Sequence, residues 1–432
     1  MPFQVSQQRP SVSTPLATIS AMKILHICPA YPPSQGGAET HSARISQGLA
    51  ARGHEVTVLT TDLSGPSFSS SAGLPAEEII HGVRVRRLPS DGGAAGSLLR
   101  FWQELPGGYR SLVKAFGREG VEVISHQPHL PSLILRILVA EADVISVINW
   151  YWPLAYYAYL ARQMKKFTLV GIPLLHLEEP WCSTSLFKRM LASCDAVIAN
   201  TSYEADYVRQ LGAVRAESIG VGIEPSEFVG RNSYDPRALY QLGGLPVVGY
   251  VGRLQLNKGV ATLIRAMHLV WTSRPDVRLV LAGPRITPDH EILALMEGLS
   301  NAERERIVYI YDFPEAHKRA IFDAFDVFAM PSMAESFGIA YLEAWMCGKP
   351  VIGARTNQVQ CVIDDGVDGL LVKLGDPGET ASALLELLAD PKKRDEMGRH
   401  GRQKTESHFT WDKVTTKVER LYFDLVAKRS LV

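Results

Sequence analysis

Two glutamates with seven residues between them, Glu335 and Glu343, are the pair in this chain whose types and spacing most favour chemistry. They flank the point where a predicted strand at 326–330 gives way to a predicted helix at about 339–347. The first amides of a helix lack partners inside the helix and attract phosphate. Carboxylates do not hold phosphate, but they accept hydrogen bonds from hydroxyl groups. A phosphate site with a carboxylate on each side therefore fits a nucleoside diphosphate that carries a sugar.

Solvated side chains are the simpler explanation of two such glutamates, because Glu is common near helix starts. A second segment argues for a site. The predicted strand at 247–251 is followed by a glycine turn and then by Arg253 and Lys258. Open α/β sheets bind ligands at the carboxyl ends of their strands, and both cations suit phosphate. Alone they read as ordinary surface residues, but the two segments together predict a diphosphate site.

A pair of glycines, Gly36 and Gly37, lies between a predicted strand at 23–28 and a predicted helix at 38–52. Glycine lets a ligand approach the backbone, and the helix that follows presents its N-terminus. A plain turn would use the same two residues, so the pair is weak evidence by itself.

The composition excludes several classes of protein. The 432 residues are 46% hydrophobic, and the 45 basic residues balance 45 acidic ones. A net charge of zero argues against a nucleic-acid partner and against strong, purely electrostatic membrane attachment. The five cysteines form no CxxC pair or His/Cys cluster, so we expect no disulfide scaffold and no zinc site but a cytoplasmic protein with reduced thiols. Residues 1–21 are expected to be a disordered tail, or an extension upstream of a start at Met22.

The elements that must position these residues alternate between strand and helix in both halves of the chain. Strand-like runs include one at 121–125. Alternation of this kind predicts two doubly wound parallel sheets. We expect a first domain at 22–222, a linker rich in Pro and Gly at 223–245, a second domain at 246–408 and a C-terminal helical segment at 409–432.

Three segments together resemble a known family. They are GRLQLNKG (252–259), ESFGIAYLEAWMCGKPVI (335–352) and DDGVDGLLV (364–372), and they are similar to those of the retaining glycosyltransferases of family 4. The resemblance extends from about residue 22 to the C-terminus. It implies a GT-B fold, in which two Rossmann-like α/β domains face a central cleft and the C-terminal helix crosses back onto the first domain. It also implies transfer of a hexose-type sugar, with retention, from a nucleoside-diphosphate sugar to a sugar, glycolipid or small-molecule acceptor.

The resemblance implies a role for each candidate residue. Glu335 would hold the hydroxyls of the transferred sugar, and Glu343 would bind the ribose of the nucleotide. Backbone contacts to the donor would come from the segment between them, that is from Ser336, Phe337, Gly338 and Ile339. Gly36 and Gly37 would face the diphosphate from the first domain.

His176 follows the predicted strand at 168–175, where similar family members place a histidine near the transferred sugar. A lone histidine is more often structural or exposed. The resemblance favours His176 as a residue that positions a sugar hydroxyl or the acceptor, and not as a nucleophile.

The chain contains no Asp-x-Asp pair, the usual metal clamp of the other large glycosyltransferase fold. We therefore expect no metal and no cofactor beyond the nucleotide sugar itself. Charge on the leaving diphosphate would be met by Arg253, Lys258 and helix amides. Many relatives carry a glycine-rich turn after the strand that follows the glutamate segment, and here Asn357 and Gln358 replace small residues of that turn, so the resemblance does not identify the base.

Three other functions remain open from the sequence. A nucleotide-sugar epimerase uses the same fold, and a catalytically silent scaffold or partner subunit would bind the same donor. A nicotinamide-dependent dehydrogenase is disfavoured, because no GxGxxG follows a strand.

Contact with the inner face of a membrane is a further hypothesis. It rests on an aromatic run at 150–159 and on the cluster Arg84, Arg86 and Arg87. A buried helix and a solvated strand edge explain the same residues, and no uninterrupted apolar stretch of about 20 residues exists to span a bilayer.

Overall fold

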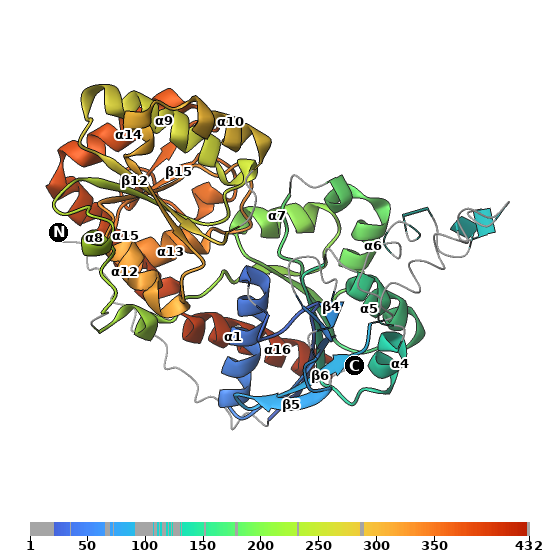
Figure 1. Ribbon diagram of the computed structural model, residues 1–432. Helices are drawn as coiled ribbons and strands as arrows, with labels where there is room; N and C mark the ends of the chain where they lie inside the picture. Colours follow the sequence, from blue (N-terminus) through green and yellow to red (C-terminus); the bar gives the residue numbers. More distant parts are fainter. Residues whose placement is uncertain are drawn as a thin grey trace, which may run out of the picture.

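The computed structural model describes residues 21–34, 36–64, 70–71, 73–90, 130, 132–150, 153–177, 180–230, 233–285 and 289–429, with isolated residues between 107 and 123. The chain forms two α/β domains, and Figure 1 shows them as separate lobes, one blue to green and one yellow to red. The predicted fold class, two doubly wound parallel sheets, is confirmed. The expected tail at 1–21 lies outside the described residues except for its last position.

The first sheet has the strand order β10-β9-β8-β7-β1-β2-β6-β5 and is parallel except for β5, which runs antiparallel to β6. Its strands are β1 (Lys23–Ile27), β2 (Glu55–Thr61), β5 (Glu77–Ile80), β6 (Val83–Leu88), β7 (Val144–Ile148), β8 (Leu169–Ile172), β9 (Ala196–Ala199) and β10 (Ala216–Ser218). A separate two-stranded ribbon is formed by β3 (Leu63–Ser64) and β4 (Ser70–Ser71). The helices of this half are α1 (Gly37–Ala51), α4 (Leu133–Val139), α5 (Pro153–Met164), α6 (Ser185–Ala192) and α7 (Ser202–Gln210).

The second sheet is parallel throughout, with the order β13-β12-β11-β14-β15-β16. Its strands are β11 (Val247–Val251), β12 (Arg278–Gly283), β13 (Ile307–Tyr311), β14 (Val327–Met330), β15 (Val351–Ala354) and β16 (Gly369–Val372). The helices are α8 (Pro236–Leu239), α9 (Val260–Ser273), α10 (His290–Gly298), α11 (Asn301–Arg304), α12 (Lys318–Asp323), α13 (Ile339–Met346), α14 (Pro377–Ala389), α15 (Pro391–His408) and α16 (Trp411–Arg429). Short 3-10 turns lie at Pro180–Ser183, Pro225–Phe228, Leu256–Lys258, Glu315–His317 and Val359–Cys361.

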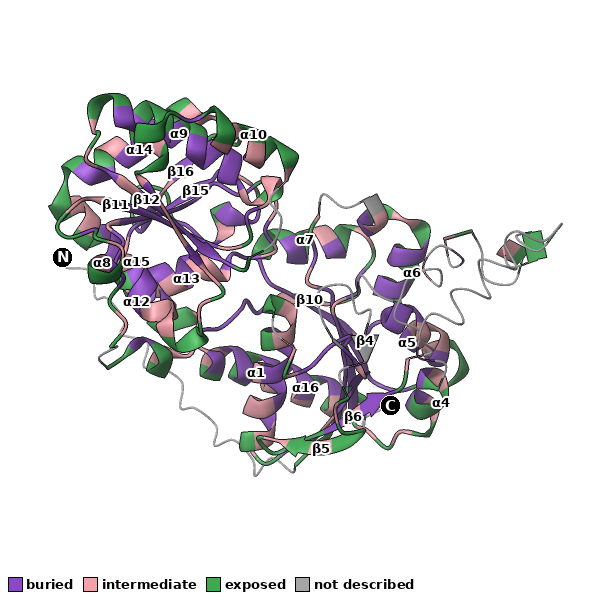
Figure 2. Ribbon diagram, in the orientation of Figure 1, coloured by how far each residue is buried: buried purple, intermediate pink, exposed green. Residues whose placement is uncertain are grey.

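The inner strands of both sheets read as largely apolar runs because helices cover both faces. Every residue of β7, β9, β11 and β14 is buried, and Figure 2 shows the inner strands as buried while the outer surfaces of the helices are exposed. The strand predicted at 121–125 was wrong: Val121 and Val123 have helical backbone, and the rest of that range is not described. Periodicity does not separate a short buried strand from a short buried helix.

The two domains are joined by two stretches of chain that lie side by side. The amide of Ile223 donates to the carbonyl of Phe409 (2.8 Å), and the amide of Trp411 donates back to Ile223 (3.1 Å). Ile223 and Thr410 thus form an isolated parallel bridge. The outgoing linker and the returning C-terminal segment are therefore hydrogen-bonded to each other where they cross between domains.

The C-terminal helix α16 crosses back to the first domain, as predicted, and lies beside α1 (Figure 1). A buried polar network anchors it to the sheet. The phenol oxygen of Tyr422 lies 3.2 Å from Nε2 of His26 and 2.5 Å from the hydroxyl of Ser146, while Nδ1 of His26 lies 2.7 Å from the hydroxyl of Ser46. Burial, with a smaller effect from His41, lowers the pKa of His26 to about 3, so the network holds a neutral imidazole.

This network predicts that acid destabilises the fold. The folded-state pKa of His26 lies below its ordinary value of 6.5, so the unfolded chain binds a proton first, and stability is lost as pH falls below about 6.5 toward 3. The free energy of unfolding should fall by up to about 1.4 kcal/mol per pH unit on account of this residue. His26→Gln should show a shallower dependence in urea denaturation between pH 8 and pH 5; parallel curves for variant and wild type would contradict the prediction.

Candidate active site

The site forms where the strand order of the second sheet reverses. β11 lies between β12 and β14, so the loops that follow β11 and β14 leave the sheet side by side at its carboxyl edge. Such a switch point is the usual ligand crevice of an open α/β sheet. The hydroxyl of Ser332 and the amide of Met333 both donate to the carbonyl of Asn257, each at 2.9 Å. These bonds hold the segment of Lys258, predicted to bind phosphate, against the loop that leads to Glu335, predicted to bind the sugar.

Gly259 shows how tightly the two loops approach. Its φ is +75°, and a Cβ there would collide with the carbonyl of Pro331. Only glycine combines that left-handed backbone with so close an approach. The last glycine of the GRLQLNKG segment, Gly259, is therefore required by packing against the β14 loop.

Lys258 and Glu335 form an ion pair in this crevice. Their Nζ and Oε1 atoms are 2.8 Å apart, and the side chains are 14% and 10% exposed. Lys258 also donates to the carbonyl of Ala334 at 3.3 Å. The sequence assigned these residues to different parts of the donor, and the structure brings them into direct contact. An entering diphosphate would compete with Glu335 for the ammonium group of Lys258.

The helix N-terminus expected between the two glutamates is present. Gly338 has φ +94°, and a Cβ on it would overlap the ring of Tyr341. α13 then begins at Ile339 without a side-chain cap, which leaves its first amides suited to an anion. Phe337 is buried edge-on against Phe409, with ring centroids 5.4 Å apart, so this loop is anchored to the crossing between domains.

Glu343 lies on the second turn of α13 and pairs with a residue that sequence reasoning missed. The Nζ of Lys318 lies 2.9 Å from its Oε1. Burial raises the pKa of Glu343, and Lys318 opposes that rise. Burial likewise opposes the charge of Lys318, but Glu343 and Glu315 outweigh it and raise the Lys318 pKa. Nothing in the spacing of Lys318 singled it out; α12 brings it to α13 only in the folded chain.

A hollow of about 180 Å³ opens beside this pair. The residues that line it come from the linker and from the start of α12: Glu227, Phe228, Glu315, Ala316, Lys318 and Arg319. The place predicted for the ribose is thus at the edge of a depression between the linker and the second domain.

The first domain supplies the opposite wall. A Cβ on Gly37 would lie 4.0 Å from Cδ1 of Ile339, so the glycine loop faces the start of α13 across the domain boundary. The carboxylate of Glu39 lies against Gly36, where a Cβ would be. The two segments predicted to bind the diphosphate from opposite domains are therefore neighbours.

Two predicted residues lie at the rim. Arg253 is exposed directly after β11, and its carbonyl accepts the hydroxyl of Tyr250 at 2.6 Å. His176 is exposed after β8, and its carbonyl accepts a hydrogen bond from Sγ of Cys182 at 3.5 Å. The side-chain roles of both residues remain predictions.

Two weak contacts join the domains close to Ser336. Nδ2 of Asn200, after β9, lies 3.5 Å from the hydroxyl of Ser336, and the hydroxyl of Ser202 lies 3.4 Å from Sγ of Cys361. Asn200 was not predicted from the sequence. It carries no motif, and only the meeting of the two sheets brings it to Ser336.

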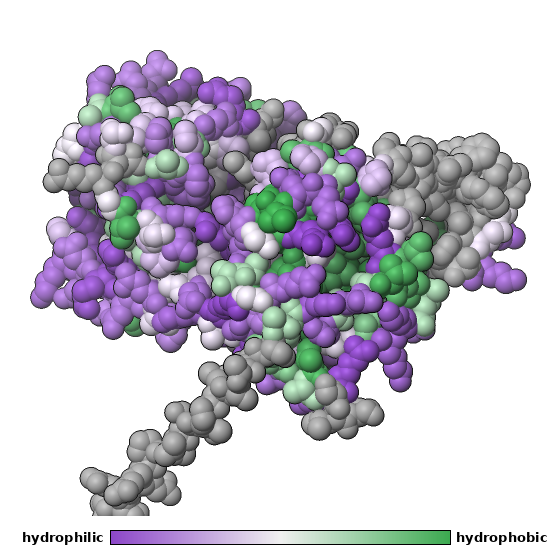
Figure 3. Space-filling view, turned by 90° about the horizontal axis from the view of Figure 1, so that it is seen from below, coloured by the Kyte–Doolittle hydropathy of each residue, from purple (hydrophilic) through white to green (hydrophobic). Residues whose placement is uncertain are grey.

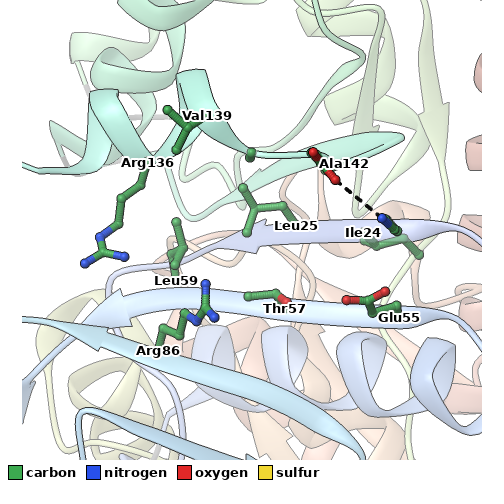
Figure 4. A pocket seen from close by; sticks show the side chains of 12 residues that line it. Ile24, Leu25, Glu55, Thr57, Leu59, Arg86, Arg136, Val139 and Ala142 are labelled. Carbon is green, nitrogen blue, oxygen red and sulfur yellow. Dashed lines mark ion pairs between the residues drawn. The ribbon is translucent and has the colours of Figure 1, made fainter.

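A second hollow, of about 230 Å³, lies away from these residues at the opposite edge of the first sheet (Figure 4). It is lined by β1, β2, β6 and α4, and Lys23 and Glu141 pair across it at 3.7 Å. None of the predicted site residues lines it. Within the described part of the chain, no three His, Cys, Asp or Glu side chains gather in a way that could hold a metal ion.

Comparison with known proteins agrees with this geometry. The family model described as Glycosyltransferase Family 4 matches residues 35–227, and the model described as Glycosyl transferases group 1 matches residues 245–390. This chain belongs to the family 4 glycosyltransferases. Among its relatives, the D-inositol 3-phosphate glycosyltransferase of Xylanimonas cellulosilytica is 29% identical over 95% of this chain and 97% of its own length. That of Salinispora tropica is 28% identical over 98% and 89%.

Solved structures show the same fold. Sucrose-phosphate synthase from Thermosynechococcus elongatus superimposes with a TM-score of 0.70 at 22% identity, covering 94% of this glycosyltransferase and 100% of that chain. HepE from Anabaena, in complex with UDP-glucose, gives a TM-score of 0.67 at 20% identity, covering 93% and 100%. The predicted GT-B architecture is thereby confirmed.

The predicted roles of Lys258 and Glu335 differ, so substitution of the first should affect diphosphate binding and substitution of the second should affect sugar transfer. Lys258→Ala should weaken binding of a nucleoside diphosphate by about 10- to 150-fold, because a hydrogen bond to a charged group contributes roughly 1.5–3 kcal/mol. Glu335→Ala should leave that binding intact and abolish most sugar transfer. Calorimetry measures the binding, and release of nucleoside diphosphate from a nucleotide sugar measures the reaction.

The matched control is Glu386→Ala, which removes an exposed carboxylate of the same domain that is paired with Lys393. It should change neither quantity. Equal loss of binding and transfer in Glu335→Ala would exclude a role confined to the sugar.

Proposed function

We propose that this glycosyltransferase moves a hexose-type sugar from a nucleoside-diphosphate sugar to an acceptor hydroxyl, with retention at the anomeric carbon. The observation that carries the proposal is the Lys258–Glu335 pair at the uncapped start of α13, with a second charged pair, Lys318–Glu343, one turn further along. The cation and the helix amides suit the diphosphate, and the carboxylates on either side suit the hydroxyl groups of the sugar and of the ribose.

The chemistry follows from these positions. The acceptor oxygen bonds to the anomeric carbon as the bond from that carbon to the diphosphate breaks, on the same face of the sugar. The electron pair stays on the diphosphate, and the hydroxyl proton leaves with it. Arg253, Lys258 and the first amides of α13 meet the charge that develops. Glu335 and His176 orient the sugar and the acceptor, and Gly37 lets the diphosphate approach the first domain. No metal or cofactor has a step in this scheme.

The relatives suggest which ligands to try. HepE was solved with UDP-glucose, and the curated relatives are named for D-inositol 3-phosphate. The first name supports a uridine or related nucleotide as donor. The second supports a small phosphorylated polyol as the first acceptor to test. Glycolipid and sugar acceptors remain in the proposal.

A thermal-shift screen against UDP, GDP, ADP and their common sugar conjugates, with a chelator present, tests the donor site. A ligand at 100 times its dissociation constant stabilises the native state by about 2.7 kcal/mol, a rise in melting temperature of roughly 3–5 °C. One nucleotide family should give this shift, and Lys258→Ala should lose it. No shift with any nucleotide at millimolar concentration would favour a silent scaffold over an enzyme.

Membrane contact, if it occurs, is peripheral in this proposal. In the described part of the chain no helix is long and apolar enough to cross a bilayer. The residues first suspected of touching lipid are engaged in the fold: Trp150 and Tyr156 are buried, and Arg87 is buried against Glu78. Arg84 and Arg86 lie 3.8 and 3.3 Å from Glu77.

Exposed apolar residues on α4 are the better support for lipid contact. Leu135 and Val139 are 64% and 67% exposed, with Arg136 between them. Figure 3 shows apolar residues on one face as separate patches among hydrophilic ones.

Flotation with liposomes that contain anionic lipid tests this contact. The wild type should float at low salt and lose binding as salt is raised, because salt screens the basic residues, and Val139→Asp should bind less. Absence of flotation at low salt would exclude the contact.

A further inference from the structure

Glu204 is a buried carboxylate with no cation beside it among the residues that the structure describes. It lies in the first turn of α7 and is 1% exposed. Buried charges are usually paired, since their desolvation is costly. Here the partners are backbone amides instead. Oε2 accepts from the amide of Asn200 at 2.7 Å, and Oε1 accepts from the amide of Leu175 at 3.1 Å. Neither proposed donor binding nor the chemistry above uses this residue.

A helix cap explains only part of this arrangement. Thr201 caps α7 by accepting the amide of Glu204 at 3.1 Å, which is the Thr-x-x-Glu pattern of a capping box. The chain has a reciprocal capping box at Ser300 and Glu303, where the capping bonds lie at the start of α11 and Glu303 also pairs with His268 of α9 at 2.6 Å. Glu204 differs because it is buried and because it reaches Leu175, on the loop that follows the neighbouring strand β8.

The β8 loop is strained at the point where Glu204 holds it. Leu174 has φ +54°, a left-handed conformation that costs a leucine energy and persists only where its surroundings determine it. The residue before it is held by the amide of Trp150, which donates to the carbonyl of Pro173 at 3.2 Å. The residue after it is held by Glu204. His176 comes next in the chain, so its direction depends on these two bonds.

The other oxygen of Glu204 holds the loop after β9. Asn200 is 3% exposed, and its side chain reaches Ser336, the neighbour of Glu335. Its Oδ1 is buried without a hydrogen-bond partner among the described residues. One carboxylate thus joins the loop that carries His176 to the loop that touches the sugar-binding segment of the other domain.

We propose that Glu204 is a positioning residue for sugar transfer, which fixes the β8 loop and the β9 loop against each other and thereby sets where His176 stands relative to Ser336 and Glu335. The inference rests on the proposed function in so far as His176 acts on the sugar or the acceptor. Glu204 itself touches neither substrate.

The ionisation of Glu204 predicts a dependence of loop positioning on pH that can be measured. Burial raises its pKa to about 7, against the opposing effect of the amides of Asn200, Leu175 and Thr201. Of the titratable residues next to it in α7, Tyr203 and Asp206 are exposed and Tyr207 is partly exposed, and His176 on the β8 loop is exposed. An ionised carboxylate accepts at both oxygens, whereas a protonated one donates from one of them. Below about pH 7 the carboxyl group therefore no longer accepts from both amides at once, and the two loops are no longer fixed against each other.

Stability and positioning respond to pH in opposite directions. The folded-state pKa lies above the ordinary value of 4.5, so the fold binds a proton that the unfolded chain releases. This residue's contribution to stability is therefore greatest below about pH 4.5 and is lost as pH rises through 7. Loop positioning improves over the same range. A purely structural role would not separate the two.

Glu204→Gln, compared with Glu303→Gln in the capping box of α11, which lies in the second domain, tests the proposal. Three quantities are measured from pH 6 to pH 9: backbone amide exchange in peptides that contain Leu175 and Asn200, corrected for intrinsic rates; binding of UDP; and release of UDP from UDP-glucose. Glu204→Gln should exchange at least tenfold faster in both loops, bind UDP within twofold of the wild type, and turn over at least tenfold more slowly. Its activity should also lack the acidic limb that the wild type shows near pH 7. Glu303→Gln should match the wild type in all three.

Unchanged exchange in the two loops, or an unchanged pH profile of turnover, would overturn the inference. If Glu204→Gln does not fold, wild-type exchange decides: both loops must lose protection between pH 8 and pH 6 while β11 and β14 do not. A wild type that neither binds nor cleaves any nucleotide sugar would instead sink the proposed function, and the exchange data would still show whether Glu204 fixes the loops.

Discussion

The reversal of strand order between β11 and β14 is the constraint on which the rest of the site depends. Because β11 and β14 are neighbouring parallel strands, their carboxyl ends lie side by side. The chain continues from β11 toward β12 on one side and from β14 toward β15 on the other, which leaves a crevice between the two loops. The loops that do so are held by Asn257 and crowded at Gly259. Lys258 and Glu335 meet there only because the sheet brings together residues 77 positions apart.

Charge in this crevice is arranged in pairs. Lys258 is matched by Glu335, and Lys318 by Glu343. Partly buried charges of either sign are costly alone, so each cation that suits a diphosphate is kept by a carboxylate that suits a hydroxyl. In the proposed function, the diphosphate and the hydroxyl groups of a nucleotide sugar would replace the partners within each pair.

Much of this arrangement could be predicted from the sequence, because it follows from local rules. The glycine turn, the strand at 247–251 and the helix from Ile339 are encoded by short patterns, and so is α16, whose apolar periodicity marked it. What escaped prediction depends on contacts between distant elements. Lys318 has no motif, and the pattern at Glu204 looks like an ordinary helix cap. The short apolar run at 121–125 was misread because burial alone does not distinguish strand from helix.

The paired crossings at Ile223 and Thr410 limit how the two domains move. Two connections that lie together and share hydrogen bonds allow rotation about one line and resist sliding or separation. Phe409 belongs to that line, and it packs on Phe337 two residues from Glu335. A rotation of one lobe about this line would therefore be transmitted through Phe337 to the loop that carries Glu335.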